Sequence, residues 1–272
     1  MAPIDFSGQT TIVTGASSGI GAAFARELAR RGSDVVLVAR RRDRLEDLAS
    51  ELRARHHGVR ATVAPLDLSE PGAGRRLAAE LAGQGIRVDG LVNNAGFGTN
   101  GAFHREDPDR LTDEINVDVA NLVDLTRAFI EPLRDSGRGI LVNVASAAAY
   151  TPVPDMAVYA ACKAFVLNFT EALWYESRGT GLRVLSLAPG LTRTEFFDRF
   201  EGGAYQGSYE TPEQVVATAM RTLDRGGRRP SVPSGRMNAL MVSLPRLFTR
   251  RRTVLIGGRI AARSSGKVGA AA

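Results

Sequence analysis

Lysine is almost absent from this chain. Of its 35 basic residues, only Lys163 and Lys267 are lysine, and the other 33 are arginine. A composition with this bias places arginine wherever a surface cation is sufficient, so a retained lysine indicates a role that arginine fills badly. The lysine ammonium is compact and its pKa can be shifted by its surroundings, whereas a guanidinium is bulky and always charged. Lys163 is therefore a candidate functional residue.

Cysteine and long apolar runs are also scarce. The single cysteine, Cys162, excludes an internal disulfide and favours a reducing compartment. We interpret it as a small helix residue rather than a nucleophile, and we predict no metal site. No stretch approaches the roughly 18 apolar residues of a membrane-spanning helix, and Met1–Ser7 is polar and short, unlike a signal peptide. These absences predict a cytoplasmic protein.

Acidic residues are missing from the C-terminal part of the chain. From Arg225 to Ala272 there are ten arginines, one lysine and no Asp or Glu, a charge of +11; because the whole chain carries +6, residues 1–224 carry 6 − 11 = −5. Apolar residues at helical spacing lie in this part: Met237, Leu240, Met241, Leu244, Leu247 and Phe248. Pro245 interrupts them and Arg250–Arg252 follow. The pattern predicts a basic amphipathic extension over residues 236–272.

Two interpretations of this extension remain open. It could make peripheral contact with an anionic membrane face, or grip a lipid-like substrate. Alternatively, it could cover the substrate cleft or a subunit interface, with its arginines in water. We expect no nucleic-acid binding, because no reader motif accompanies the charge.

The rest of the chain alternates strand and helix patterns. Short apolar runs at 11–14, 34–39, 139–144 and 183–187 are typical of buried strands, and 22–31, 108–129 and 156–178 have helical composition. This βαβ spacing predicts a doubly wound parallel sheet with helices on both faces. With 272 residues and 44% hydrophobic composition, the chain can form one domain with a large core, which we place at residues 1–235.

A glycine-rich turn joins the first predicted strand to the first helix. Gly15, Gly19 and Gly21 lie in Gly15–Gly21, between Thr11–Thr14 and Ala22–Arg31. In this context glycines let a pyrophosphate approach the main chain at a helix N-terminus. The spacing GxxxGxG differs from GxGxxG, and a merely flexible turn is the alternative interpretation. The position between a strand and a helix favours a dinucleotide site.

The second predicted strand ends next to arginines. Ala39 closes it and Arg40 follows, in the run Arg40–Arg42. In a dinucleotide fold this strand end meets the adenine ribose, where an arginine accommodates a 2′-phosphate and an acid would accept from a free 2′-hydroxyl. The alternative is a charge cluster at a helix start. The sequence thus predicts NADP(H) over NAD(H).

Tyr159 precedes Lys163 by four residues, so a helix places both side chains on one face. An ammonium beside a phenol favours the phenolate and lowers the tyrosine pKa from about 10 towards the range of a general acid or base. An isolated YxxxK is usually a surface pair. Ser146, however, lies just past the predicted strand 139–144, at the sheet edge where active groups gather.

Together these segments resemble the short-chain dehydrogenase/reductase family. The resemblance rests on motifs in the expected order: Thr14–Gly21, Asn93–Gly96, Asn116, Ser146, Tyr159 with Lys163, and Pro189–Gly190. It implies a single Rossmann-type domain, a nicotinamide cofactor and a Ser-Tyr-Lys-Asn catalytic group. By this resemblance Ser146 donates to the substrate oxygen, Tyr159 moves the proton, Lys163 assists the tyrosine and reaches the ribose, and Asn116 supports a water chain.

The resemblance also implies the residues that bind the cofactor. They are Gly15, Ser17, Ser18, Gly19, Ile20, Gly21, Arg40, Asp67, Asn93, Ala95, Gly96, Tyr159, Lys163, Pro189, Gly190, Leu191, Thr192 and Thr194. Asp67 resembles the family's adenine contact, but it could equally cap a helix starting at Ser69–Pro71. Family members are often dimers or tetramers through their two long helices, here 108–129 and 156–178, so we predict a homodimer or homotetramer.

The resemblance further implies a mobile substrate lid at about residues 191–212. Five aromatic residues lie there, namely Phe196, Phe197, Phe200, Tyr205 and Tyr209, and Gly202, Gly203 and Gly207 would permit hinge motion. They favour an apolar substrate such as a long-chain aldehyde, an acyl derivative or a steroid-like ketone, unless the rings only pack under a loop. We predict an NADP(H)-dependent enzyme interconverting a carbonyl and an alcohol. Alternatives are a non-catalytic NADP(H) sensor and a membrane-associated scaffold.

Overall fold

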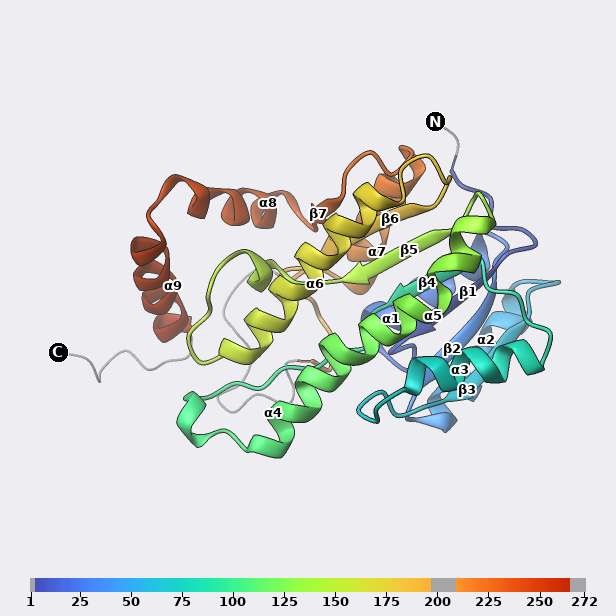
Figure 1. The fold of residues 1–272 in the computed structure, drawn as a ribbon, viewed down its shortest axis with the longest axis horizontal. Helices are drawn as coiled ribbons and strands as arrows, with labels where there is room; N and C mark the ends of the chain where they lie inside the picture. Colours follow the sequence, from blue (N-terminus) through green and yellow to red (C-terminus); the bar gives the residue numbers. More distant parts are fainter. Residues whose placement is uncertain (1–2, 197–208, 265–272) are drawn as a thin grey trace.

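The fold is built on one parallel sheet. The structure is a computed structural model and describes residues 3–196 and 209–264. In this part of the chain seven strands pair in the order β3-β2-β1-β4-β5-β6-β7 (Figure 1). The strands are β1 (Thr10–Thr14), β2 (Asp34–Ala39), β3 (Ala61–Pro65), β4 (Gly90–Asn93), β5 (Ile140–Val144), β6 (Arg183–Ala188) and β7 (Ser231–Pro233). Strand order reverses between β1 and β4, the switch point at which open α/β sheets bind ligands.

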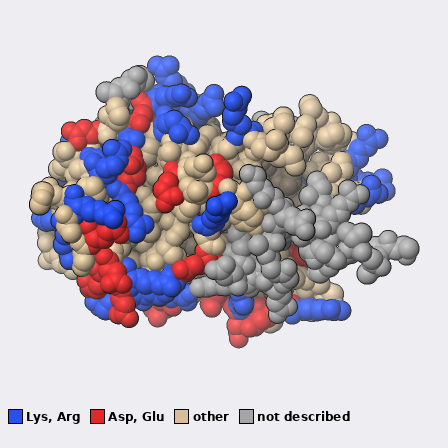
Figure 2. Space-filling model, turned by 180° about the vertical axis from the view of Figure 1, so that it is seen from behind, with Lys and Arg blue, Asp and Glu red and all other residues tan. Residues whose placement is uncertain are grey.

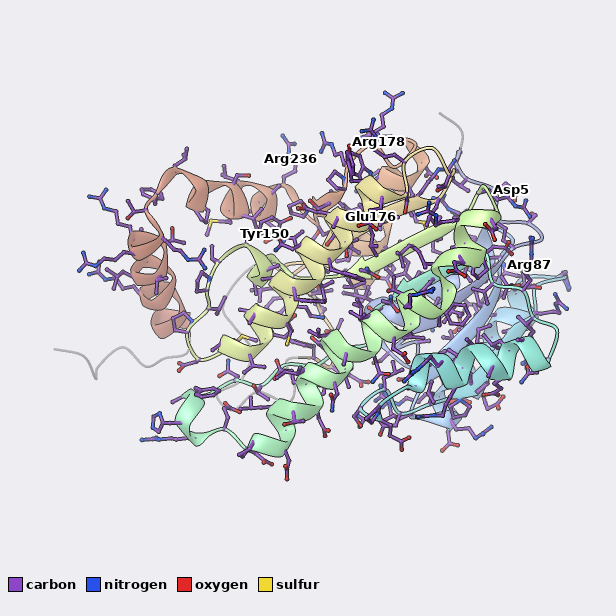
Figure 3. The ribbon with its side chains drawn as sticks, viewed as in Figure 1. Asp5, Arg87, Tyr150, Glu176, Arg178 and Arg236 are labelled. Atoms are coloured by element: carbon purple, nitrogen blue, oxygen red, sulfur yellow. The ribbon has the colours of Figure 1, made fainter. Side chains whose placement is uncertain are left out.

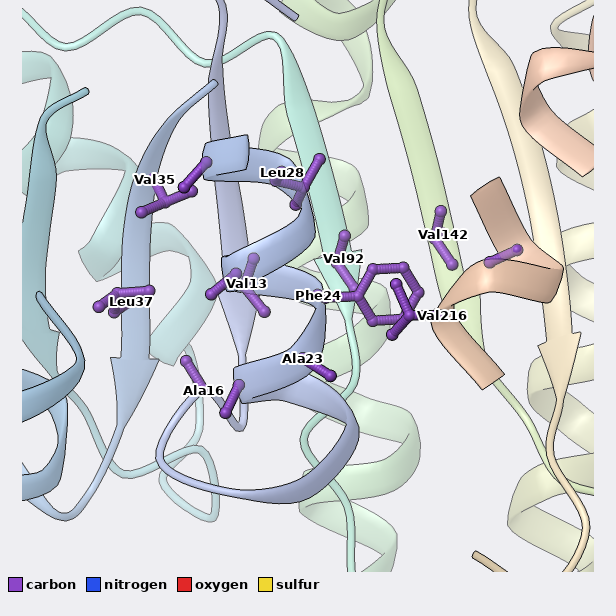
Figure 4. Packing of buried hydrophobic residues seen from close by; sticks show 14 of the residues in the cluster. Val13, Ala16, Ala23, Phe24, Leu28, Val35, Leu37, Val92, Val142 and Val216 are labelled. Atoms are coloured by element: carbon purple, nitrogen blue, oxygen red, sulfur yellow. The ribbon is translucent and has the colours of Figure 1, made fainter. Parts of the chain in front are cut away.

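Helices cover both faces of the sheet, as the alternating pattern predicts. One layer holds α1 (Gly19–Arg30), α2 (Arg42–Arg55) and α7 (Pro212–Asp224), and the other holds α3 (Ala73–Gly83), α5 (Asn121–Asp135) and α6 (Ala157–Glu176). Successive strand residues point to opposite layers. Val13 and Val35 pack under α1 with Phe24, as Figure 4 shows, whereas Ile12 packs in the opposite cluster. The predicted doubly wound α/β fold is confirmed.

The helix predicted over 108–129 is longer and interrupted. It consists of α4 (Pro108–Ile115), a π-helical turn (Asn116–Ala120) and α5, which continues to Asp135. Leu125, Phe129 and Leu133 recur at four-residue spacing and are buried against the sheet, which explains why the helix passes the predicted end. The π turn adds a residue to one turn and so changes which side chains face inward.

The segment after β3 also differs from expectation. α3 begins at Ala73, after Gly72 in the left-handed region (φ 72°), and not at Ser69–Pro71. Asp67 instead stabilises the turn before it, because its Oδ1 accepts from the Ser69 amide (2.9 Å) and hydroxyl (2.8 Å). The capping interpretation of Asp67 is therefore wrong in detail: the side chain closes a local turn.

The basic extension forms α8 (Arg236–Ser243), a 3₁₀ turn (Leu244–Leu247) and α9 (Arg250–Ser264). Pro245 lies in the 3₁₀ turn, where the amphipathic pattern is interrupted. Figure 1 shows both helices beyond the carboxyl end of β5. Figure 2, seen from behind, shows that basic and acidic side chains are mixed over the side of the molecule away from these helices. Within residues 3–196 and 209–264, no helix has the length and hydropathy needed to cross a membrane.

Candidate active site

A cleft of about 1060 Å³ opens at the carboxyl ends of the strands. It collects nearly every residue that the sequence marks as a site residue, although these residues come from distant parts of the chain. Its lining includes Gly15, Ser17, Ser18, Gly19, Ile20, Arg40, Asp67, Ala95, Gly96, Ser146, Tyr159, Lys163, Pro189, Gly190, Leu191, Thr192 and Thr194. Gly21, Asn93 and Asn116 are the predicted site residues that do not line it.

The glycine-rich turn provides a cradle without side chains. Gly15 and Gly19 adopt φ of 66° and 54°. A Cβ on Gly15 would lie 2.7 Å from Asn94 Nδ2, and one on Gly19 would lie 2.9 Å from Thr194 Cγ2. α1 starts at Gly19, so its first amide groups face the cleft. This arrangement fits the pyrophosphate of a dinucleotide.

Gly21 and Asn93 support the packing around the cleft and do not line it. A Cβ on Gly21 would meet the Gly15 carbonyl oxygen, so this glycine lets α1 pack against the turn. Asn93 is buried and donates from Nδ2 to Thr126 Oγ1 (3.0 Å) and Asn143 Oδ1 (2.9 Å). Because side chains alternate along a strand, the Asn93 side chain points to the face of the sheet that α5 covers, and it does not line the cleft.

Its neighbour Asn94 is the one that reaches the cleft. The Asn94 backbone amide donates to Thr14 Oγ1 (2.9 Å), and Asn94 Nδ2 donates to the Thr14 carbonyl oxygen (2.9 Å). These bonds join the ends of β1 and β4 beneath Gly15. Sequence reasoning missed this role, although the motif Asn93–Gly96 contains the residue.

Basic residues gather where β2 ends. Arg40 is 62% exposed and its Nη1 lies 3.9 Å from Asp67 Oδ2. Arg41, which the sequence interpretation left out, donates from Nη2 to Ser17 Oγ and Ser18 Oγ, both at 2.9 Å. The guanidinium therefore joins the arginine run to the glycine-rich turn.

Glu195 closes this cluster from the other side of the cleft. It accepts from Arg41 Nη1 (2.8 Å) and from Arg44, and both arginines lower the pKa of its carboxyl. The three residues form what we call the Arg41–Glu195 cluster. No local sequence signal marks it, because Arg41 and Arg44 lie at the start of α2 and Glu195 lies in the segment after β6.

Ser146, Tyr159 and Lys163 converge at the cleft floor. Ser146 lies two residues after the end of β5 and precedes a 3₁₀ turn over Ala147–Tyr150, while Tyr159 and Lys163 lie one turn apart on α6. The Lys163 ammonium lies 5.6 Å from the centroid of the Tyr159 ring and donates to the Val144 carbonyl oxygen at 3.3 Å. Both side chains are more than nine-tenths buried.

The direction of the Tyr159 pKa differs from the sequence expectation. Burial raises it, and Asp118 and Glu114 raise it further; Lys163 and a hydrogen bond with Ser146 lower it but do not offset the burial. Desolvation disfavours a buried phenolate more than one ammonium stabilises it. Without cofactor, Tyr159 therefore holds its proton at neutral pH. Burial likewise raises the pKa of Cys162 to about 12, which fits a small inert helix residue.

Asn116 is not the helix residue that meets Lys163. It is half-buried, and its carbonyl oxygen accepts from Asn121 Nδ2 at 3.4 Å. Asp118, two residues later in the π turn, occupies the inward position: its Oδ2 lies 2.9 Å from Lys163 Nζ and its Oδ1 accepts from the Phe97 amide at 3.1 Å. The shift follows from the π turn, which sequence periodicity does not register.

A second buried acid lies one turn before Asp118. Glu114 has an exposed fraction of 0%, and its Oε2 accepts from the Thr99 amide at 3.0 Å. Burial raises the pKa of Glu114 to about 7, with a smaller contribution from Asp118. Sequence reasoning missed both acids, since nothing in the local pattern separates them from the exposed acids of α4.

Known proteins share this architecture and these motifs. A family model described as short chain dehydrogenase matches residues 9–202. The chain is 40% identical over 189 residues to sulfoacetaldehyde reductase 2 of Chromohalobacter salexigens, which covers 68% of this chain and 73% of the relative.

Solved structures agree. One, from work on 7beta-hydroxysteroid dehydrogenase stereoselectivity, superposes with a TM-score of 0.82 at 29% identity, covering 93% of this chain and 97% of that one. Another, a short-chain dehydrogenase from Sphingobium yanoikuyae in complex with NADPH, has a TM-score of 0.75 at 32% identity, covering 88% and 94%. The chain belongs to the short-chain dehydrogenase family. It is an oxidoreductase acting on alcohol or carbonyl groups.

Beyond the floor formed by Ser146, Tyr159 and Lys163, the cleft of this short-chain dehydrogenase is largely apolar. Phe196 packs on Tyr159 with ring centroids 5.3 Å apart. α8, the 3₁₀ turn and α9 add a C-terminal wall, which consists of Met241, Val242, Leu244, Pro245, Phe248, Thr253, Ile256 and Gly257. In Figure 3, Tyr150 lies beneath α8 and Arg236 points away from the body of the molecule. Of the predicted lid, Phe197, Phe200, Tyr205, Gly202, Gly203 and Gly207 lie outside the described residues.

Proposed function

We propose that this short-chain dehydrogenase is an NADP(H)-dependent carbonyl reductase for apolar substrates. The observation that carries the proposal is the convergence of Ser146, Tyr159 and Lys163 beside the glycine-rich cradle in one cleft. A nicotinamide cofactor, when bound, would donate the hydride to the carbonyl carbon or accept it in reverse. The chain's own residues then have to polarise the oxygen and move one proton.

Each side chain has a defined task in this proposal. The Ser146 hydroxyl, at the end of β5, donates to the substrate carbonyl oxygen. Tyr159 transfers its proton to that oxygen as the negative charge develops. Because burial raises the pKa of Tyr159, the phenol is protonated at neutral pH, which suits reduction. Lys163 stabilises the phenolate that remains.

The preference for NADP(H) rests on the arginines at the end of β2. Arg40 and Arg41 line the cleft beside Ser17 and Ser18, where the ribose of a dinucleotide meets the sheet. Guanidinium groups bind phosphate by paired, charge-assisted hydrogen bonds. The sequence prediction named Arg40; the contacts of Arg41 with both serines make it the stronger candidate.

The apolar substrate is inferred from the wall opposite the cradle. Met241, Leu244, Phe248 and Ile256 are each more than a third exposed in the cleft, so a substrate would cover them and gain about 25 cal/mol per Å² of apolar surface removed from water. A long-chain carbonyl compound or a steroid-like ketone has the required surface.

The experiment is NADPH oxidation against aldehydes and ketones of increasing chain length. Wild type is expected to turn over faster as the chain lengthens, whereas Tyr159→Phe should bind NADPH and lose activity by at least about 10³-fold. Tyr175→Phe, on the exposed end of α6, is the matched control and should behave as wild type. NADPH binding without turnover on any substrate would favour the sensor alternative.

Peripheral membrane contact is a second candidate that one observation favours. Leu247, Leu255 and Phe248 are about half exposed or more, near Arg250–Arg252 and with no acidic residue in the extension. Such a segment can insert apolar side chains while its arginines meet anionic lipid. Sedimentation with phosphatidylserine vesicles, compared with phosphatidylcholine vesicles, tests it; equal or absent binding would exclude it.

The predicted homodimer or homotetramer has support on α6. Phe165 is 41% exposed and stacks on Phe169, with ring centroids 5.7 Å apart. An exposed aromatic pair on a long helix is suited to a subunit interface. Light scattering of wild type and Phe165→Glu would test this, with a smaller mass expected for the variant.

A further inference from the structure

The burial of the Asp118 carboxylate costs free energy that its neighbours must offset. Its carboxylate is completely buried in the interior beside the catalytic group. Burying a carboxylate costs several kcal/mol, which only good pairing offsets. Here the pairing comes from the Lys163 ammonium at 2.9 Å and the Phe97 amide at 3.1 Å. Gly96 leaves the space for this pair, because a Cβ there would lie 2.7 Å from Asp118 Oδ1.

The same ammonium serves Tyr159. Lys163 has no second acidic partner among the ion pairs of the described residues, and its charge faces both the Asp118 carboxylate and the Tyr159 ring 5.6 Å away. A cation that is already paired stabilises a second anion less than a free cation does. The carboxylate thus competes with the phenolate for one ammonium.

We propose that Asp118 is a positioning residue of the catalytic group: it fixes Lys163 by a direct ion pair and offsets part of its charge, so that Tyr159 keeps its proton until the substrate oxygen becomes anionic. The proposal deepens the proposed function and rests on it for the catalytic consequence. An asparagine at this position would hold Lys163 without offsetting its charge.

The other titratable groups around this pair act in known directions. From α4, Glu114 adds negative charge above about pH 7 and raises the pKa of Tyr159 in the same direction as Asp118. From α6, Cys162 stays neutral because burial raises its pKa to about 12. β5 contributes only the Val144 carbonyl oxygen, which accepts from Lys163. Burial raises the pKa of the Asp118 carboxyl itself, and the Lys163 ammonium and the Phe97 amide act to lower it. Asp118 is the counter-charge in direct contact with Lys163, and Glu114 is a second acid without an ion pair to Lys163.

The direct test is a titration of Tyr159 in Asp118→Asn. Tyrosinate absorbance is followed against pH, and the same titration of variants that also carry Tyr159→Phe is subtracted to isolate this one phenol. Tyrosinate should form about one to three pH units lower in Asp118→Asn, the range expected when one neighbouring charge is removed. Asparagine has nearly the same shape and still accepts from the Phe97 amide, and thermal unfolding confirms that the variant folds.

Two further variants serve as a control and as a second test. Asp124→Asn removes an equal charge from α5, where the carboxylate pairs with exposed Arg75, and should leave the titration unchanged. Glu114→Gln should shift it in the same direction by a smaller amount, and replaces the first variant if Asp118→Asn does not fold. An unchanged or higher titration in folded Asp118→Asn overturns the proposal; if that variant does not fold, the same result in Glu114→Gln overturns it.

Turnover separates this inference from the proposed function. In Asp118→Asn the alkaline fall in kcat for carbonyl reduction should move to lower pH together with the tyrosinate. A shifted titration in a protein that reduces no carbonyl would refute the proposed function alone. Carbonyl reduction with an unshifted titration and an unshifted kcat profile would refute the role of Asp118 alone.

Discussion

Gly96 leaves room for the ion pair between Asp118 and Lys163, because a hydrogen atom stands in place of a side chain. In Gly96→Ala the new Cβ would lie 2.7 Å from Asp118 Oδ1 and 3.0 Å from Lys163 Nζ, so the ion pair must shift. We expect kcat for carbonyl reduction to fall about tenfold or more, since tenfold corresponds to only about 1.4 kcal/mol of transition-state stabilisation. Gly83→Ala is the control, because its Cβ would meet nothing within 4 Å. Equal activity of both variants would contradict the tight packing at Gly96.

Glu114 links the stability of the folded protein to pH. The folded state holds the Glu114 proton up to about pH 7, whereas an unfolded chain loses it near 4.5. The folded state therefore binds more protons in this interval, and this residue lowers the free energy of unfolding as pH rises through it. Glu114→Gln removes the effect. As pH rises from about 4.5 to about 7, the free energy of unfolding of the variant should therefore increase relative to that of wild type, by on the order of 3 kcal/mol.

Urea unfolding of both proteins at several pH values measures this gain. Glu131→Gln is the control, because Glu131 is an exposed acid that pairs with exposed Arg127. A gain that does not depend on pH would mean that Glu114 is ionised in the folded state throughout.

Between elements, the Arg41–Glu195 cluster joins α2 to the segment after β6. Glu195 holds the guanidinium groups that a 2′-phosphate would need, so the two anions would compete. Glu195→Gln should tighten NADPH binding by about tenfold or more, in the range of a charged hydrogen bond, and leave NADH binding unchanged. Arg41→Gln should weaken NADPH binding by a similar factor.

Equilibrium fluorescence titration with NADPH and NADH measures these affinities. Glu51→Gln, which breaks the ion pair with Arg26 away from the cleft, is the control. Equal changes for NADPH and NADH would show that the cluster does not recognise the phosphate.

At the scale of the whole molecule, removal of α9 tests whether the C-terminal wall contacts the substrate. A chain ending at Thr249 retains β7 and α8, and Glu210 still accepts from Ser234 and Asn238 on either side of the α8 start. The sheet should fold, and NADPH should bind as in wild type. Loss of Ile256 and its neighbours should raise KM for long-chain carbonyl substrates about tenfold, since burying such a side chain contributes about 1.5–3 kcal/mol.

Replacing Arg250, Arg251 and Arg252 by glutamine keeps the apolar wall and removes the charge. This variant should keep the KM of wild type and lose binding to anionic vesicles if α9 contacts a membrane. Unchanged KM in the chain ending at Thr249 would show that α9 does not contact the substrate.

Much of the fold was predictable because its signals are local. The strand runs, the glycine-rich turn and the helix that carries Tyr159 and Lys163 each depend on neighbouring residues, and all form close to their predicted bounds. In a doubly wound sheet the carboxyl ends of strands meet at one edge. Ser146 and the motif Pro189–Gly190 could therefore be placed in one cleft before any contact was known.

The tertiary structure decided what these local signals leave open. The sequence by itself determined the sheet, the glycine-rich turn and the pairing of Tyr159 with Lys163, since each follows from spacing along a strand end or one helix face. Packing alone turned Asp118 rather than Asn116 towards Lys163 and brought Glu195 to Arg41. The physical reason is that a π turn resets the inward face of a helix, and an ion pair between distant segments forms only when the layers close.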